Sequence, residues 1–208
     1  MKALILVDIQ NDFLPGGALA VPNGDEVIPV ANQLQRVFPL VVATQDWHPP
    51  NHGSFAANHP GRKIFEQIDL NGLPQTLWPV HCVQNTPGAQ LAPGLHRERI
   101  AKVFPKGTDP AEDSYSGLFD NGRRHSTGLG EWLKAQDVAE VYVCGLATDY
   151  CVKFTALDAA RMGFKTYLIE DASRGVNLRP EDVPRGIEEM QQAGIKIVTS
   201  TELRHAQG

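Results

Sequence analysis

The stretch EVYVCGLATDYCVKFTALDAARMGFKTYLIE, residues Glu140–Glu170, decides the fold because it holds two strand patterns separated by a helix pattern. The runs Glu140–Leu146 and Lys165–Glu170 are mostly apolar, which is typical of strands covered on both faces. Residues Asp149–Met162 between them have helical spacing, with Cys151 in the first turn. A strand, a helix and a second strand in this order predict two parallel strands joined by a crossover helix.

The same alternation recurs through the rest of the chain. It predicts an α/β fold, a single-domain three-layer sandwich in which a six-stranded, mostly parallel sheet has helices on both faces. A region rich in His, Pro, Gly and Asn interrupts the pattern, and we expect it to form a loop insertion around residues 46–93 within one domain spanning residues 1–208. The remaining expected strands are Ala3–Asp8, Leu40–Asp46, Arg99–Lys106 and Lys196–Ser200, and the remaining expected helices are Gly24–Phe38, Leu129–Gln136 and Glu181–Gly194.

The composition narrows the classes of partner. The chain has 208 residues, of which 42% are hydrophobic and 21% charged, and its formal charge of −5 argues against nucleic acid or an anionic membrane as the main partner. No apolar run approaches the roughly 20 residues of a membrane span. The first apolar run, Ala3–Val7, is too short for a secretion signal, and three cysteines do not make a disulfide framework. These features predict a reduced, cytoplasmic protein.

Polar residues follow the expected strands. Asp8, Asp46 and Lys106 each end a strand pattern, and Cys151 comes one turn after another. Ligands of open parallel sheets bind beyond the carboxyl ends of the strands. We therefore expect these side chains to converge at one rim, with Asp8, Lys106 and Cys151 at three adjacent strand ends.

A cysteine in this position has the chemistry of a nucleophile. A helix N-terminus and a nearby Lys106 both favour the thiolate over the thiol. Asp8 can take the thiol proton and return it to a leaving amine, and backbone amides of the Gly145–Cys151 turn can hold an oxyanion. The plain alternative is a buried structural Cys151, with Asp8 bracing a loop and Lys106 in solvent.

The histidines suggest a metal site. Asp46, His48 and His52 lie in the segment DWHPPNH, and His81 lies in LWPVHC. Asp46 and His48 face one way in an extended segment, and a third ligand from a distant loop would complete an Asp/His/His site with open positions. Such a site suits one divalent metal, with zinc expected and iron or manganese as alternatives. The plain alternative is that polar loops collect histidines, and we take the others as surface residues: His59, His96, His125 and His205.

The segments LVDIQNDF, TQDWHPPNHGSF, WPVHCVQNTPGAQL, FPKG, DSYSGLFDN and GLATDYCVKFTALDA, in this order, resemble the nicotinamidases (pyrazinamidases) of the isochorismatase-like cysteine hydrolase superfamily. The resemblance covers nearly the whole chain. It implies hydrolysis of nicotinamide to nicotinate and ammonia in NAD salvage. It also implies hydrolysis of pyrazinamide to pyrazinoate. It also implies a thioester intermediate on Cys151 and a triad of Asp8, Lys106 and Cys151.

The resemblance also implies the surroundings of the triad. The metal ligands map to Asp46, His48 and His81, and His52 matches a histidine that only some members use. A cis peptide is expected between Leu146 and Ala147, aiming the amides of Ala147 and Cys151 at the oxyanion. The aromatic and apolar walls around the nicotinamide ring map to Phe13, Leu19, Trp78 and Tyr115.

Two alternatives remain open. One is a hydrolase of the same fold that acts on a carbamoyl compound or an isochorismate-type ether, although the isochorismatase branch is expected to lack both thiol and metal. The other is a metal-binding or thiol-redox protein, which needs a resolving cysteine; Cys144 lies seven residues before Cys151, in a strand pattern. The sequence leaves the oligomeric state undetermined.

Overall fold

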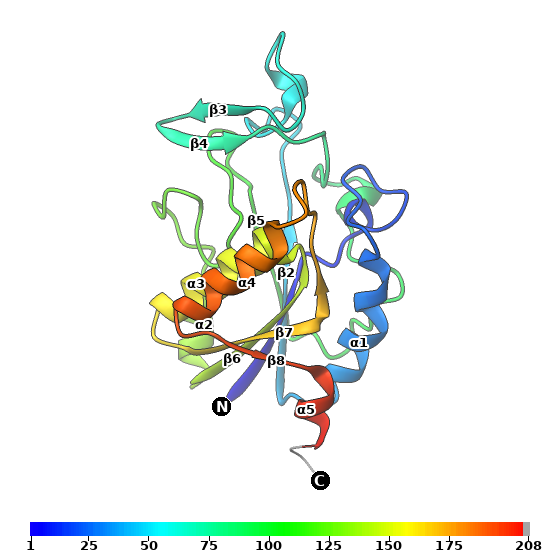
Figure 1. Ribbon diagram of the computed structural model, residues 1–208, viewed down its shortest axis with the longest axis vertical. Helices are drawn as coiled ribbons and strands as arrows, with labels where there is room; N and C mark the ends of the chain where they lie inside the picture. Colours follow the sequence, from blue (N-terminus) through cyan, green and yellow to red (C-terminus); the bar gives the residue numbers. More distant parts are fainter. Residues whose placement is uncertain (206–208) are drawn as a thin grey trace.

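The structure, a computed structural model, describes residues 1–205. Its centre is a six-stranded sheet with the order β5-β2-β1-β6-β7-β8, in which every neighbouring pair is parallel (Figure 1). The predicted α/β fold is therefore confirmed, and the sheet is wholly parallel. The strands are β1 (Lys2–Val7), β2 (Leu40–Asp46), β5 (Lys102–Lys106), β6 (Glu140–Leu146), β7 (Lys165–Arg174) and β8 (Lys196–Val198).

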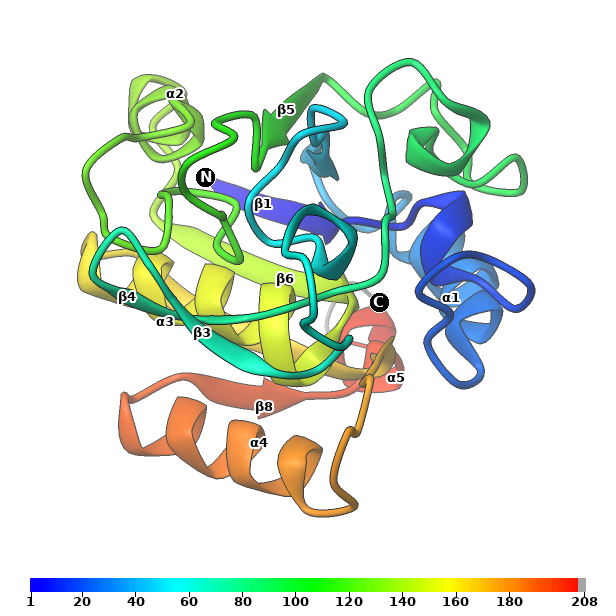
Figure 2. The same cartoon turned by 90° about the horizontal axis from the view of Figure 1, so that it is seen from above.

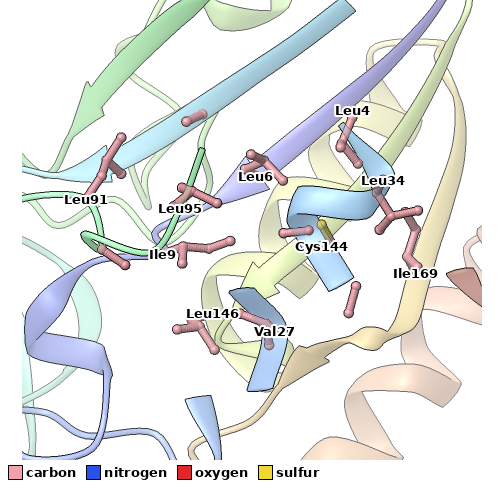
Figure 3. Packing of buried hydrophobic residues seen from close by; sticks show 14 of the residues in the cluster. Leu4, Leu6, Ile9, Val27, Leu34, Leu91, Leu95, Cys144, Leu146 and Ile169 are labelled. Atoms are coloured by element: carbon pink, nitrogen blue, oxygen red, sulfur yellow. The ribbon is translucent and has the colours of Figure 1, made fainter. Parts of the chain in front are cut away.

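Helices cover both faces of this sheet (Figure 1). The alternation of side chains along β1 shows why: Leu4 and Leu6 join one hydrophobic cluster, whereas Ile5 and Val7 join the other. The first cluster is closed by α1 (Val27–Leu34) and α5 (Ser200–His205), and Figure 3 shows Val27 and Leu34 of α1 among its residues. The second is closed by α2 (Leu129–Ala135), α3 (Lys153–Arg161) and α4 (Asp182–Gln192). No helix within residues 1–205 is long and apolar enough to span a bilayer.

The strand order reverses between β1 and β6. The chain runs from β1 outward through β2 and β5 and then returns to place β6 on the other side of β1. At this point Gly145, with a φ of 121°, lies so close to Val7 that a Cβ would collide with the Val7 backbone. Such a reversal is where open α/β sheets bind ligands, beyond the carboxyl ends of the strands. A ligand site is therefore expected among the residues that follow β1 and β6.

The interrupted region contains a hairpin that the sequence reading missed. Strands β3 (Gln67–Leu70) and β4 (Leu73–Thr76) pair antiparallel, and in the view from above they lie in front of α3 (Figure 2). Asn71 and Gly72 form the turn with φ values of 52° and 82°, which is the Asn-Gly hairpin signal. Each strand has only four residues and β4 contains Pro74, so the alternation of apolar and polar residues is too short to be recognised in the sequence. Short helical turns complete the region: η3 (Ala56–Asn58) and η4 (Pro87–Ala89).

Several predicted boundaries were wrong. The expected strand Lys196–Ser200 ends at Val198, because Thr199 and Glu202 form a capping box that starts α5; the Thr199 amide donates to the Glu202 carboxylate at 2.6 Å. The expected helix Asp149–Met162 begins as a π-helical turn, η5 (Thr148–Val152), before α3. The helix expected over Gly24–Phe38 is confined to α1 after the turn η2 (Gly24–Glu26), and the strand expected from Arg99 begins at Lys102.

Candidate active site

Lys106 is the centre of the site. It is the last residue of β5, and its side chain is fully buried. Its Nζ atom lies 2.9 Å from Asp8 Oδ2 and 3.3 Å from Cys151 Sγ, and it donates to the Ser114 carbonyl at 2.8 Å. It also donates to Asp46 Oδ1. The structure therefore brings Asp8, Lys106 and Cys151 together, but not from three adjacent strands: β2 lies between β5 and β1, and the long lysine side chain reaches across its end.

Asp8 provides a buried carboxylate beside the thiol. It directly follows β1 in a left-handed backbone conformation, with a φ of 48°. The Thr44 hydroxyl donates to its Oδ1 atom at 2.6 Å. Burial raises the pKa of Asp8 to about 6, against the opposing pull of the Lys106 ammonium. A carboxylate with this pKa accepts a proton readily near neutral pH.

Cys151 lies in the π-helical turn η5, which follows β6 after a cis peptide bond between Leu146 and Ala147. The Ala147 carbonyl accepts hydrogen bonds from the amides of Tyr150 and Val152, at 3.1 and 3.0 Å, and so points into the turn. Burial raises the pKa of the Cys151 thiol well above its usual range; Lys106 opposes this rise, and the carboxylates of Asp8 and Asp46 add to it. Desolvation outweighs the one nearby cation, so burial favours the thiol, whose proton Asp8 is placed to take.

A second group of side chains lies next to the triad. Asp46, His48 and His81 each offer a ligand atom, and these atoms all lie within 4.8 Å of one another. The Nε2 atom of His48 is 3.4 Å from Asp46 Oδ2, and that of His81 is 3.8 Å from the same oxygen. Burial alone would raise the pKa of Asp46, but Lys106 and then His48 hold it well below its usual range. A buried, ionised carboxylate thus faces two imidazoles.

Main-chain carbonyls orient these imidazoles. His48 Nδ1 is 2.8 Å from the Gly107 carbonyl, and His81 Nδ1 is 2.7 Å from the Pro79 carbonyl. Because a carbonyl only accepts, each ring donates through Nδ1 and turns its Nε2 atom toward Asp46, which is the arrangement that metal-binding histidines adopt. One carboxylate and two such histidines are the ligand set of a catalytic divalent-metal site.

His52 strengthens the fit to a metal. Its ring lies 4.3 Å from that of His48, measured between centroids, and its Nδ1 atom is 2.7 Å from Ser54 Oγ. Its Nε2 atom is buried and has no hydrogen-bond partner. Burial lowers the pKa of His52 to about 4, so the ring is neutral and able to act as a ligand. His52 and His48 also form a second close group with Asp113. An unpartnered buried nitrogen at this position fits a bound divalent ion.

A pocket opens between the thiol and the histidines. The space between its lining atoms, including the part that is open to solvent, is about 380 Å³. Phe13, Leu19, Trp78 and Tyr115 all line it, together with Cys151, Ala147, Asp46, His48 and His81. Trp78 Nε1 donates to the Tyr115 hydroxyl at 3.1 Å, which fixes the angle between these two walls. The pocket therefore places aromatic walls, two histidines and the Cys151 thiol around one small-molecule site.

Sequence reasoning missed several residues of this site. Tyr150, Val176 and Asp113 also line the pocket. Tyr150 was detectable as the neighbour of Cys151, whereas Val176 lies in a loop with no distinctive pattern. Gln10 clamps Asp46: its Oε1 accepts from the Asp46 amide at 2.8 Å, and its Nε2 donates to the Asp46 carbonyl at 2.9 Å.

The remaining histidines lie apart from the site. His96 and His125 are exposed, and His125 Nδ1 is 2.8 Å from Asp120. His59 is only partly exposed, and its Nε2 atom is 2.7 Å from the Gly53 carbonyl, away from the site. The side chain of His205 lies outside the described part of the structure.

Comparison with known proteins gives the family. Residues 2–202 match the model of the Isochorismatase domain. The chain belongs to the isochorismatase family. It is 53% identical over 211 residues to the nicotinamidase of Escherichia coli (strain K12), covering 100% of this chain and 99% of that protein. Such similarity places the chain in the nicotinamidase branch of the isochorismatase family.

Two solved structures support this placement. A nicotinamidase/pyrazinamidase from Acinetobacter baumanii superposes with a TM-score of 0.95 at 47% identity, covering 97% of each chain. The pyrazinamidase of Pyrococcus horikoshii, solved in complex with zinc, superposes with a TM-score of 0.79 at 44% identity, covering 95% of this chain and 98% of that one. The isochorismatase family therefore includes a zinc-bound relative with this fold.

Proposed function

We propose that this chain is a metal-dependent cysteine amidohydrolase that converts nicotinamide to nicotinate and ammonia, and pyrazinamide to pyrazinoate. The observation that carries the proposal is the position of Lys106 Nζ, 2.9 Å from the Asp8 carboxylate and 3.3 Å from the Cys151 thiol, beside a pocket lined by an Asp/His/His group. The high identity to nicotinamidases supports the choice of substrate.

The first half of the reaction uses the thiol and the carboxylate. Asp8 takes the proton from Cys151 as the sulfur attacks the carboxamide carbon, so the thiolate exists only during the attack. Lys106 stabilises the negative charge that forms on sulfur. The carboxamide oxygen, now an oxyanion, receives hydrogen bonds from the amides of Ala147 and Cys151. Asp8 then gives its proton to the nitrogen, the carbon–nitrogen bond breaks, and ammonia leaves a nicotinoyl thioester.

The second half of the reaction restores the enzyme. Asp8 is ionised again once it has protonated the leaving nitrogen, and it takes a proton from a water molecule that attacks the thioester carbon. The carbon–sulfur bond breaks, and the proton on Asp8 returns to the Cys151 sulfur. The products are the free thiol and nicotinic acid, which loses its proton to water as nicotinate, so one water is consumed for each amide cleaved.

The ring is held at the other end of the pocket. Trp78 and Phe13 provide apolar walls, and Asp46, His48 and His81 would hold the divalent ion. When bound, the ion supplies a Lewis acid for the ring nitrogen of the substrate. We propose zinc as this ion, with the zinc complex of the Pyrococcus horikoshii relative as support, and we propose His52 as a further ligand.

The same features weigh against the alternatives. A thiol-redox protein needs a second thiol beside Cys151, but Cys82 and Cys144 are fully buried in the hydrophobic cluster on the other face of the sheet. A carbamoyl-cleaving hydrolase would use the triad yet has no need for a ring-facing metal. Nicotinamide as substrate accounts for both parts of the site. We further propose a cytoplasmic role in NAD salvage, with a small molecule as the partner.

The test is ammonia release from nicotinamide by the purified, metal-loaded protein, beside the variants Cys151→Ala and Cys144→Ala. We expect release by the native chain and by Cys144→Ala, and none by Cys151→Ala. Folded, metal-loaded protein that releases no ammonia from nicotinamide would refute the substrate. Turnover by Cys151→Ala would refute the nucleophile.

A further inference from the structure

We infer that Asp149 is a specificity-determining residue: it fixes Val176 as a wall of the pocket and so sets which rings the site accepts. The inference rests on the proposed function for the identity of the substrate. Asp149 lies in η5, two residues before Cys151, and only 5% of its surface is exposed. Asp149 itself does not line the pocket, whereas Val176 does.

The carboxylate of Asp149 holds two successive backbone amides. Its Oδ1 atom accepts from the Val176 amide at 2.9 Å, and its Oδ2 atom accepts from the Asn177 amide at 2.8 Å. Outside helices and strands, no backbone carbonyl within residues 1–205 accepts from either amide. The position of Val176 therefore depends on Asp149.

The loop between β7 and α4 fits closely around this carboxylate. Figure 1 shows this loop, in orange, at the same end of the sheet as the β3–β4 hairpin. A Cβ at Gly175 would lie 3.1 Å from Asp149 Oδ1 and would collide with the Val183 side chain. Asn177 adopts a left-handed conformation with a φ of 50°, and its side-chain oxygen accepts from the Val183 amide at 3.2 Å. This close approach lets one side chain hold the loop against the turn that carries the nucleophile.

The two hydrogen bonds require a carboxylate. An asparagine at position 149 has one oxygen and one NH₂ group, so it can accept from only one of the two amides and would face the other with a donor. Asp149→Asn therefore releases one side of the loop without removing side-chain volume. Val176 then moves outward, and the pocket gains room for about a methyl group. Pocket contacts discriminate one such group by roughly 10-fold to 200-fold in kcat/KM.

The experiment measures kcat and KM for nicotinamide and for its ring-methylated isomers in the native protein, Asp149→Asn, Val176→Ala and the double variant. For at least one isomer, we expect its kcat/KM relative to nicotinamide to rise about tenfold in each single variant. The double variant should show no more than the larger single effect, because both changes act through Val176. The control is Asp182→Ala, which removes the carboxylate that accepts from the Arg179 amide at 2.8 Å in the same loop, and it should leave the ratio unchanged.

A second readout is independent of activity. Amide hydrogen exchange, followed by NMR, should be slow at Val176 and Asn177 in the native protein and at least tenfold faster at one of them in Asp149→Asn. Unchanged exchange, additive effects in the double variant, or an equal loss of kcat/KM for every isomer would overturn the inference. If the native protein does not hydrolyse nicotinamide, the proposed function fails; hydrogen exchange and the equilibrium binding of nicotinate and methylated nicotinates then decide the role of Asp149.

Discussion

Replacing Lys106 with methionine would remove the ammonium that contacts both buried carboxylates of the site. Methionine has a similar length and no charge, so the change isolates the electrostatic role of Lys106. The side chains of Lys106 and Asp8 are both fully buried, and Asp46 is exposed by only 6%. Removing one partner of a buried ion pair typically costs 3–5 kcal/mol, because the remaining charge is left without a counterion. We expect Lys106→Met to lower the free energy of unfolding by about 3–5 kcal/mol at pH 8.

The chain offers a control with the same contact distance. Lys153 Nζ lies 2.9 Å from Glu189 Oε2, as Lys106 Nζ does from Asp8 Oδ2, but the Glu189 side chain is 52% exposed. An exposed pair contributes about 0–1 kcal/mol, so Lys153→Met should change stability by less than about 1 kcal/mol. Both variants would be measured by urea unfolding of metal-free protein in the presence of a chelator.

The stability loss in Lys106→Met should become smaller as the pH falls. Without Lys106, the pKa values of Asp8 and Asp46 rise, so both carboxyls take up protons more readily as the pH falls and the unpaired charge disappears. The deficit of Lys106→Met relative to the native protein should therefore be smaller at pH 5 than at pH 8. A loss no larger than that of Lys153→Met, or a loss that does not vary between these pH values, would refute the reasoning.

Three further predictions concern the reaction. Because Asp8 must be ionised and burial raises its pKa to about 6, kcat/KM should fall about tenfold per pH unit below pH 6. Asp8→Asn should lower kcat by about 10²–10⁴-fold. A value of kcat/KM that stays constant down to pH 5 would contradict the role of Asp8 as the base. Because burial raises the pKa of the Cys151 thiol, iodoacetamide should modify Cys151 slowly at pH 7 and faster as the pH rises. Mass spectrometry measures the rate of modification, and rapid modification at pH 6 would contradict the raised thiol pKa. His81→Ala should weaken zinc binding more than 100-fold, which exceeds the roughly 10–100-fold loss typical of replacing a residue that only supports a ligand. Zinc affinity would be measured by competition with a chelating dye, and an unchanged affinity would exclude His81 as a ligand.

Much of the fold was predictable because hydrophobic periodicity carries it. All six strands of the main sheet were found, since β1, β2 and β6 are covered on both faces and read as unbroken apolar runs. The edges of elements were less predictable. The capping box that begins at Thr199 spans four residues and the Asn71-Gly72 turn spans two, so both are too short to show in a periodicity pattern.

The residues at the strand ends of the candidate site were predictable, whereas some pocket residues and the pKa values of the site were not. The carboxyl ends of parallel strands meet at one rim, so Asp8, Asp46 and Lys106 could be grouped from the sequence alone. The strand order and the reach of Lys106 across β2 depend on the packed structure. The high pKa of the Cys151 thiol also depends on it, because desolvation is a property of the closed pocket and leaves no trace in a motif.

The attack of Cys151 on the carboxamide carbon is the central claim, and its direct test is the covalent intermediate. Metal-loaded protein would be mixed with nicotinamide, quenched in acid within milliseconds, and analysed by intact-protein and peptide mass spectrometry. We expect a transient mass increase of one nicotinoyl group that maps to Cys151, is lost as nicotinate forms, and is absent from Cys151→Ala. Turnover of nicotinamide with no nicotinoyl adduct on Cys151 at any quench time, or an adduct on another residue, would contradict the account.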